Sequence, residues 1–295
     1  MSARNVRDNL KNAGGRQATS SAQSDSGGAS VISAEGQRFF RKRSLFILAL
    51  FLVFFGVNAI AGGYVDFDFG ASILDIPAGL AWMATNFIPS AESLAKLSVI
   101  LPALGSTILV SIASSTMAAI FAYIFAVLGS RSVGVGGIVS IVVRGIASLF
   151  RNIPVVAWAF ILLFSFKQSE FTGFLALFLT SFGYLTRCFL ESIDEVSEGS
   201  VEALRATGAS YLSIITQAVI PLSITSVVSW LLYMIETNIR DATLIGILTG
   251  TGIGFVFDLY YKSFRYDIAG LVIVLIVVAV IACEAISNYV RRQVI

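Results

Sequence analysis

Long apolar segments are the feature that most restricts how this chain can fold. A helix that crosses a membrane needs about 20 predominantly apolar residues. Such segments recur along the sequence, and we expect membrane spans at residues 44–63, 99–129, 154–166, 171–190, 219–238 and 267–288. Only 13% of the 295 residues are charged, whereas a soluble domain has about 25%. The sequence therefore predicts an all-α membrane protein with six transmembrane helices.

The basic residues that flank these segments predict which side of the membrane each end faces. Cytoplasmic loops carry an excess of Lys and Arg. Residues 1–43 hold eight basic residues, whereas residues 64–97 hold four acidic residues and one lysine. This distribution predicts that both termini and the segment 191–218 are cytoplasmic, although a few basic residues then fall on the outer side.

The same pattern divides the chain into four parts. Residues 1–37 are polar and lack apolar periodicity, so they are predicted to form a disordered cytoplasmic tail. Residues 38–63 are predicted to form the first transmembrane helix. Residues 64–98 are predicted to be an extracytoplasmic loop, in which a short helix with aromatic residues could lie at the membrane surface. Residues 99–295 then form the core of the protein.

The composition argues against several kinds of chemistry. The sequence has no histidine, so the commonest metal ligand is absent, and we expect no metal site and no cofactor in this chain. It has no G-x-x-x-x-G-K-[ST] phosphate-binding loop, and its net charge of +2 gives no reason to expect nucleic acid as a partner. Cys188 and Cys283 lie in apolar segments and are expected to be packing residues rather than a disulfide.

A short charged segment interrupts the apolar sequence between the fourth and fifth spans. It reads ESIDEVSEGSVEALRATGASYLSIITQAVIP over residues 191–221. Ser200 is expected to cap a helix that ends near Thr207, with Gly208 in a left-handed conformation after it. The apolar residues of this segment that share one helical face are Val201, Leu204 and Ala209.

Two interpretations of this segment stay open on its helix pattern alone. It could be an amphipathic helix that lies on the bilayer, or a surface that another protein grips. A helix bound to anionic lipid is typically basic, whereas residues 191–202 carry five acidic residues and no basic residue. The acidic character favours a protein partner.

Small residues and prolines predict how the spans pack and begin. The span at 99–129 carries small residues at helical spacing, which favours close helix packing over a substrate-lining role. These residues are Thr107, Ser111, Ser114, Ser115, Thr116, Ala118, Ala119 and Ala122. Pro154 and Pro221 are expected in the first turn of the third and fifth spans, and Asn152 could cap the third.

A second distinctive stretch, IETNIRDATLIGILTGTGIG, covers residues 235–254. Glu236 and Arg240 are four residues apart, in the order that favours a helical ion pair. Two interpretations stay open: a structural ion pair at the outer rim, or a path for an anionic substrate lined by Arg240 or Asn238. Glycines let backbones approach closely. A packed hinge or gate is therefore predicted at Gly246, Gly250, Gly252 and Gly254.

The sequence EALRATGASYLSIITQAVIP resembles the signature of the membrane subunits of ABC importers, which is Glu-Ala-Ala, three residues, Gly, nine residues and Ile-x-Leu-Pro. The residues at the family's spacing are Glu202, Ala203, Gly208 and Pro221, whereas Leu204, Ala218 and Ile220 depart from it. The segments 151–160 (RNIPVVAWAF) and 235–254 resemble the phosphonate-importer permeases of that family. In the latter, Thr249, Gly250 and Thr251 depart from the usual residues. The resemblance covers about residues 90–295.

This resemblance implies a type I importer permease fold in the bacterial cytoplasmic membrane, with both termini cytoplasmic. It implies a coupling helix at about residues 200–208 that docks on a cytoplasmic ABC ATPase dimer. The residues expected to act in this coupling are Glu202, Ala203, Arg205 and Gly208. ATP and Mg²⁺ would be bound by the ATPase, so this chain would not be an enzyme.

The resemblance also implies the other partners: a second permease copy or a sister permease, and an extracytoplasmic substrate-binding protein. The implied substrate is a phosphonate or a related phosphorus oxyanion, carried by alternating access. The alternative is an ion-coupled secondary transporter, which often needs carboxylates or histidines inside the membrane. The first four expected spans have almost no carboxylates in their centres, and histidine is absent. A membrane scaffold that moves nothing is a third possibility.

Overall fold

The computed structural model describes residues 39–65 and 68–294, and the regular elements in these two ranges are all helical. The expected disordered tail at 1–37 lies outside the described residues. The chain divides into two compact units, one ending at Gly79 and one running from Leu80 to Ile295.

In the first unit, the expected first span is a helix, Phe39–Tyr64. It has 26 residues, about 39 Å at 1.5 Å per residue, which exceeds a hydrocarbon core of about 30 Å. Its apolar side chains are exposed, as suits a helix surrounded by lipid. Helix α2, Phe69–Asn86, lies where the short surface helix was predicted and runs across the boundary between the two units. Its position at the membrane surface stays a prediction.

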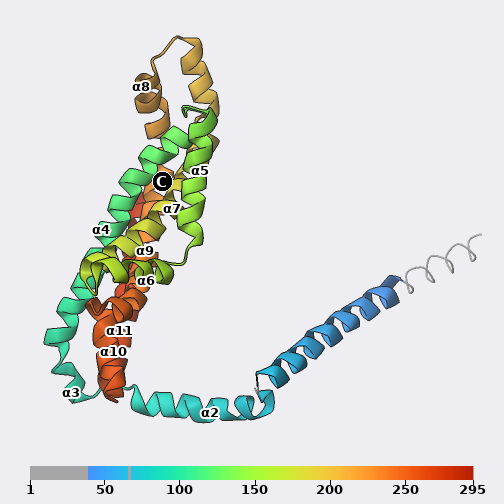
Figure 1. Cartoon of the computed structure of the whole chain (residues 1–295), viewed down its shortest axis with the longest axis vertical. Helices are drawn as coiled ribbons and strands as arrows, with labels where there is room; N and C mark the ends of the chain where they lie inside the picture. The colour runs from blue at the N-terminus through green and yellow to red at the C-terminus, as the bar shows by residue number, and fades with distance from the viewer. Residues whose placement is uncertain (1–38, 66–67, 295) are drawn as a thin grey trace, which may run out of the picture. The chain divides into compact units, whose positions relative to one another are not determined.

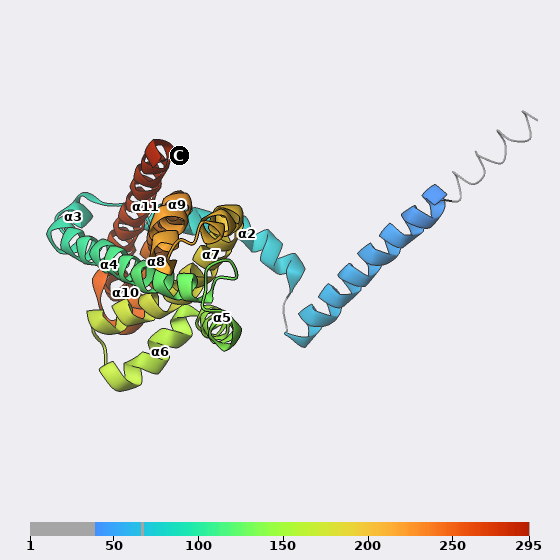
Figure 2. The same ribbon diagram turned by 90° about the horizontal axis from the view of Figure 1, so that it is seen from above.

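The second unit is built around long helices that run lengthwise through the bundle (Figure 1). Its elements are α3 (Ala91–Leu94), α4 (Leu97–Gly129), α5 (Gly137–Asn152), α6 (Val155–Phe166), α7 (Glu170–Ala206), α8 (Tyr211–Ile214), the π-helix η1 (Ile215–Val219), α9 (Ile220–Thr249), α10 (Gly252–Lys262) and α11 (Tyr266–Val294). Seen from above, α5 and α6 lie on one flank of α7 and α11 lies on the other (Figure 2). One end of the bundle carries α3 and α10, and the opposite end carries α8 (Figure 1).

The described residues contain five helices that are long and apolar enough to cross a membrane. The expected third span is α6, whose 12 residues extend only about 18 Å. It is bent by 91° against α5. The predicted six spans are therefore reached only when the bent pair α5–α6 is counted as one.

Two predicted helix ends are wrong, and one is confirmed. Ser200 does not begin a helix, because α7 continues unbroken from Glu170 to Ala206. Pro221 lies in the first turn of α9, as predicted, although the helical segment continues back through η1 to Tyr211. Asn152 does not cap α6: it ends α5, and its amide donates to Ser148 Oγ at 3.2 Å.

The π-helix η1 explains how a helix passes Pro221. Proline has no N–H to donate within a helix, and its ring crowds the carbonyl of the preceding turn. Just before it, the Ile220 N–H bonds the carbonyl of Ile215, five residues back. The wider turn changes the hydrogen-bond register without breaking the helix.

Small polar side chains hold α4, α7 and α9 together. The Asn238 side chain, in α9, donates to Ser115 Oγ of α4 at 2.8 Å and to Ser181 Oγ of α7 at 2.7 Å. Ser111 Oγ of α4 donates to the Asn238 carbonyl oxygen at 3.1 Å. All of these residues are buried. The packing role predicted for the small residues of α4 is confirmed, except at Thr116, which is exposed.

We predict that Asn238→Ala destabilises the bundle. The change removes two side-chain hydrogen bonds between helices, which together contribute about 1–3 kcal/mol inside a membrane protein. Unfolding of the purified protein in mixed micelles, followed by circular dichroism, measures this loss. The matched control is Thr237→Ala, because the Thr237 hydroxyl bonds only within α9, to the Tyr233 carbonyl. Equal stability of the two variants would contradict the prediction.

Candidate functional site

The connection between α7 and α8, residues 200–210, is the first candidate site and is called the α7–α8 turn below. Gly208 has a φ of +77°, the left-handed region that favours glycine. Its N–H bonds the Arg205 carbonyl at 3.0 Å, and the Ala209 N–H bonds the Leu204 carbonyl at 3.1 Å. These two bonds form a Schellman motif. The predicted left-handed conformation of Gly208 is confirmed.

The predicted apolar face of the α7–α8 turn packs against the bundle. Val201 is only 1% exposed and belongs to the main core cluster, against which Leu204 and Ala209 pack. Glu202 and Ala203 are exposed, as are Arg205 and Gly208. The four residues predicted to contact an ATPase therefore lie together on an accessible surface, and the apolar stripe fixes that surface to the bundle.

Two further exposed residues of this surface were missed in the sequence. Ser210 caps α8, its hydroxyl accepting from the Ser213 N–H. This cap starts a new helix directly after the turn and leaves Tyr211 46% exposed and Leu212 69% exposed. The signal was available, because a serine after the left-handed glycine marks a helix start. Figure 1 shows α8 at the tip of the bundle.

The second candidate site is the glycine-rich turn between α9 and α10, residues 246–254. Gly250 ends α9 in the left-handed conformation. A Cβ at Gly254 would overlap the Thr243 carbonyl oxygen, so α9 and α10 touch backbone to backbone there. The Ile253 N–H donates to Thr107 Oγ1 of α4 at 2.9 Å. The close approach predicted for these glycines is confirmed at Gly246, Gly252 and Gly254, whereas a Cβ at Gly250 would meet the Gln168 side chain only at 3.5 Å.

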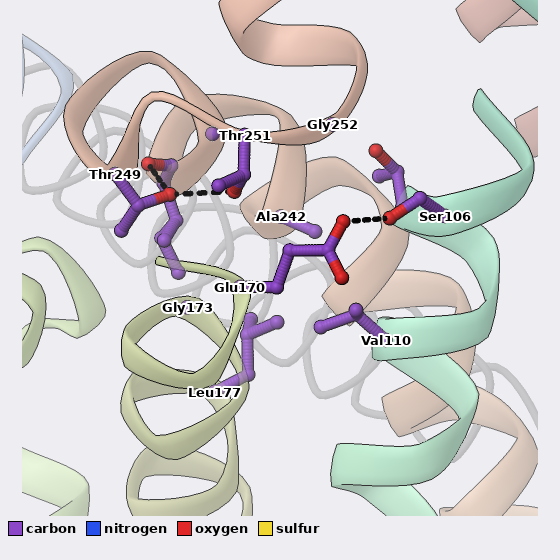
Figure 3. Close-up of a pocket in the computed structure, with 12 residues that line it drawn as sticks. Ser106, Val110, Glu170, Gly173, Leu177, Ala242, Thr249, Thr251 and Gly252 are labelled. Atoms are coloured by element: carbon purple, nitrogen blue, oxygen red, sulfur yellow. Dashed lines mark hydrogen bonds between the residues drawn. The ribbon is translucent and has the colours of Figure 1, made fainter. Parts of the chain in front are cut away.

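A small cavity lies beside this turn (Figure 3). Residues from α4, α7, α9 and the turn line it. Ser106 Oγ of α4 donates to Glu170 Oε1 of α7 at 2.7 Å, and the Thr249 and Thr251 hydroxyls are 2.9 Å apart. The cavity of about 20 Å³ has room for roughly one water molecule. In this arrangement the cavity beside the glycine-rich turn is therefore too small for a substrate anion.

Glu170 is a polar residue of this cavity that the sequence analysis missed. Its carboxylate lies between α4 and α7 and reaches Ser106 (Figure 3). Sequence offered one signal: Ser169 caps the start of α7 by accepting from the Thr172 N–H, which places Glu170 in the first turn. Its partner is 64 residues away in the sequence, which no local pattern indicates.

The predicted ion pair between Glu236 and Arg240 is confirmed, with Arg240 Nη1 3.1 Å from Glu236 Oε1. The Glu236 side chain is 15% exposed and the Arg240 side chain 48% exposed. The Glu236 carboxylate is thus largely enclosed by the protein, whereas the Arg240 guanidinium is accessible. Asn238, by contrast, is 2% exposed and joins three helices. Its predicted place on a substrate path stays a prediction.

The sequence-predicted residues therefore fall into two groups rather than one site. The α7–α8 turn lies at the α8 end of the bundle, and the glycine-rich turn lies at the α10 end (Figure 1). The helical segment Tyr211–Thr249, which ends with α9, connects them and carries the Glu236–Arg240 pair between them. One helical segment thus joins an accessible surface at one end to a packed turn at the other.

The chain is similar to several known proteins. It is 28% identical over 241 residues to the phosphite transport system permease protein PtxC of Stutzerimonas stutzeri, covering 82% of this chain and 87% of that protein. It is 27% identical over 145 residues to the phosphate-import permease protein PhnE of Mycolicibacterium smegmatis, covering 49% of this chain but only 27% of that protein.

The helical arrangement is similar to that of a solved transporter. A chain of the inward-facing MetNI methionine ABC transporter superposes with a TM-score of 0.62 at 18% identity, covering 68% of this chain and 98% of that chain. This likeness supports the predicted importer-permease fold. The sequence model of the family described as "Binding-protein-dependent transport system inner membrane component" matches residues 119–294. Because that match covers more than half of the sequence, the chain belongs to the family of inner-membrane components of binding-protein-dependent transport systems.

Proposed function

We propose that this permease imports a phosphonate, phosphite or related phosphorus oxyanion. As a member of its family it is a multi-pass protein of the cytoplasmic membrane and a transport subunit rather than an enzyme. The observation that carries the substrate class is the match to the phosphite permease PtxC, which spans most of both chains. The methionine transporter supports the fold and says nothing about the substrate.

Membership of this family gives the protein an ATPase and a substrate-binding protein as partners and argues against an ion-coupled transporter. Two ATPase subunits, with ATP and Mg²⁺ bound between them, would serve a pair of permeases. The pairing is supported by the exposed face of α9, where Tyr233 is 39% exposed and the Arg240 side chain 48% exposed. A charged side chain facing lipid is costly. A second permease copy or a sister permease would instead enclose this face around a water-filled path.

The α7–α8 turn is the proposed contact with the ATPase. It is accessible, it lies at the tip of the bundle, and its apolar face is fixed to the core. Closure of the ATPase around ATP would move this turn. Helix α7, with 37 residues, extends about 55 Å from it. Helices α7 and α9 would carry the movement to the packed glycine-rich turn and open the path outward, and hydrolysis would reset it.

The transport function is tested by reconstitution. The permease, its ATPase and its binding protein are placed in proteoliposomes, and uptake of labelled phosphite and of a methylphosphonate is measured with and without ATP. We expect uptake that requires both ATP and the binding protein. Uptake driven by an ion gradient without the ATPase would overturn the proposal, and uptake of neither compound would overturn the substrate class.

We predict that Gly208→Val abolishes docking of the ATPase. A β-branched residue is strongly disfavoured at a φ of +77°, at a cost of roughly 1–2 kcal/mol. The Schellman motif would have to rearrange. Co-purification of the ATPase and uptake should fall at least tenfold, while the yield of inserted permease stays unchanged.

The matched control for Gly208→Val is Gly199→Val. Gly199 lies within α7, and a Cβ there meets nothing within 4 Å. Because valine is no worse than glycine inside a helix, this variant should keep its ATPase. Normal ATPase recovery and normal uptake with Gly208→Val would refute the docking role.

We predict that Arg240→Ala lowers the apparent affinity for the anion during transport. Removing an accessible guanidinium should raise the half-saturating substrate concentration about tenfold, or about 1.4 kcal/mol. Arg240→Lys should retain part of the affinity. The control is Lys262→Ala, which breaks another exposed ion pair of the same spacing, with Asp258. Unchanged uptake together with a lower thermal stability would leave Arg240 with a structural role only.

A further inference from the structure

Asp194, in α7, contacts four groups of the α4–α5 connection and of α5. Its Oδ1 accepts from Ser130 Oγ at 2.6 Å, from the Arg131 N–H at 2.8 Å and from the Ser132 N–H at 3.4 Å. Its Oδ2 forms an ion pair with Arg144 Nη2 of α5 at 3.1 Å. The Asp194 and Arg144 side chains are only 22% and 21% exposed. One half-buried carboxylate therefore joins α7 to the end of α4 and to α5. We call these five residues the Asp194 clamp.

Local hydrogen bonds hold together the connection between α4 and α5, residues 130–136, next to this clamp. The Ser130 hydroxyl accepts from the Ser132 N–H at 3.1 Å. The Ser140 hydroxyl donates to the Gly129 carbonyl at 2.7 Å, and Arg144 also donates to that carbonyl at 3.4 Å. The end of α4 and the start of α5 thus form one hydrogen-bonded unit.

Helix α7 holds this unit at a second point. Arg205 Nη2, in the α7–α8 turn, donates to the Ser132 carbonyl at 2.8 Å. Asp194 and Arg205 are eleven residues apart, which is about 16 Å along a helix. Val201, which lies between the two, and Ile193, which is next to Asp194, belong to one buried cluster with Val133 and Val143. Two polar attachments and this apolar contact therefore join α7 to the α4–α5 connection and to α5.

This arrangement links α4 and α5 to the α7–α8 turn, to which they are not connected along the chain. Helix α7 leads directly into the α7–α8 turn, and α9 follows it through α8 and η1, so a push on the turn reaches both helices through the chain. Helices α4 and α5 are separate in sequence from that turn, and α4 supplies Thr107 and Ser106 to the opposite end of the bundle. Farther from the turn, α4 and α7 are already joined through the hydrogen bonds of Asn238. Near the turn, Asp194 provides the charged attachment between them.

We propose that Asp194 is a positioning residue that makes α4 and α5 follow the ATPase-driven movement of α7. The proposal rests on the proposed function of the α7–α8 turn. If the clamp only stabilised the fold, its loss would weaken ATP hydrolysis, assembly and uptake together. If the clamp couples the helices, its loss leaves docking and ATP hydrolysis intact, but fewer substrate molecules cross per ATP hydrolysed.

The test is Asp194→Asn in the complete complex of permease, ATPase and binding protein. Asparagine has the same shape, but it removes the ion pair and places an amide NH₂ among groups that donate. ATP hydrolysis and uptake of labelled phosphite are measured in the same proteoliposomes. We expect ATPase recovery and ATP hydrolysis within twofold of the wild type, and a loss of at least tenfold in uptake per ATP.

Two further variants keep this test specific. Asp194→Glu retains the charge and should recover several-fold of the uptake per ATP. Glu191→Gln breaks the exposed ion pair with Arg187 one turn earlier in the same helix and should leave the ratio unchanged. A parallel fall of hydrolysis and uptake in Asp194→Asn, or no fall in the ratio, would overturn the proposal. A wild-type complex that does not import phosphite at all would instead reject the proposed substrate.

A distance measurement tests the clamp without any substrate. Spin labels are placed by Leu149→Cys in α5 and Gly199→Cys in α7, both exposed positions outside the α7–α8 turn, with Cys188 and Cys283 replaced by alanine. Pulsed electron paramagnetic resonance on the full complex, with and without ATP, should give one narrow distance. Asp194→Asn should at least double its width, whereas Glu191→Gln should not change it. An equally narrow distribution in Asp194→Asn would refute the clamp.

Discussion

The contact of α4, α7 and α9 through small buried side chains is the constraint on which the rest of this structure depends. In lipid, apolar surface gives helices little reason to associate, because the hydrocarbon around them is equally apolar. Association has to come from close packing and from hydrogen bonds between helices. Asn238 provides both, with its amide shared between Ser115 and Ser181. The three helices therefore behave as one block whose two ends are the α7–α8 turn and the glycine-rich turn.

Glycine serves opposite purposes at these two ends. At Gly208 the surroundings are open, and what requires glycine is the positive φ that closes α7. Gly254 has to be glycine because there is no space for a side chain: a Cβ would overlap the Thr243 carbonyl oxygen. The first position gives the α7–α8 turn, the proposed contact with the ATPase, a defined shape. The second keeps α9 and α10 in direct backbone contact, so this end can open only if whole helices move apart.

The sequence predicts the features that are local. Apolar length marks the long spans, and the left-handed Gly208 and the Glu236–Arg240 pair depend on residues within a few positions of each other. The predicted helix start at Ser200 fails because an N-cap contributes only about 1 kcal/mol. With no proline between Glu170 and Ala206, α7 simply continues. Asp194 and Glu170 were missed because their partners are 50 to 64 residues away in the sequence.

The two helices that leave the α7–α8 turn are attached to the bundle in different ways. On the α7 side the helix is continuous and is held twice, at Asp194 and at Arg205. On the α9 side the path runs through α8 and the π-helix η1 before it reaches Pro221. A π turn holds the backbone in a wider geometry than an α-helix and is uncommon away from functional positions. A force on the turn would therefore act on α7, which is attached at two points, and on η1, whose backbone is wider than that of an α-helix. Because α4 is fastened to the α7 side, we expect that side to move as a unit and any bending of the bundle during transport to fall at η1.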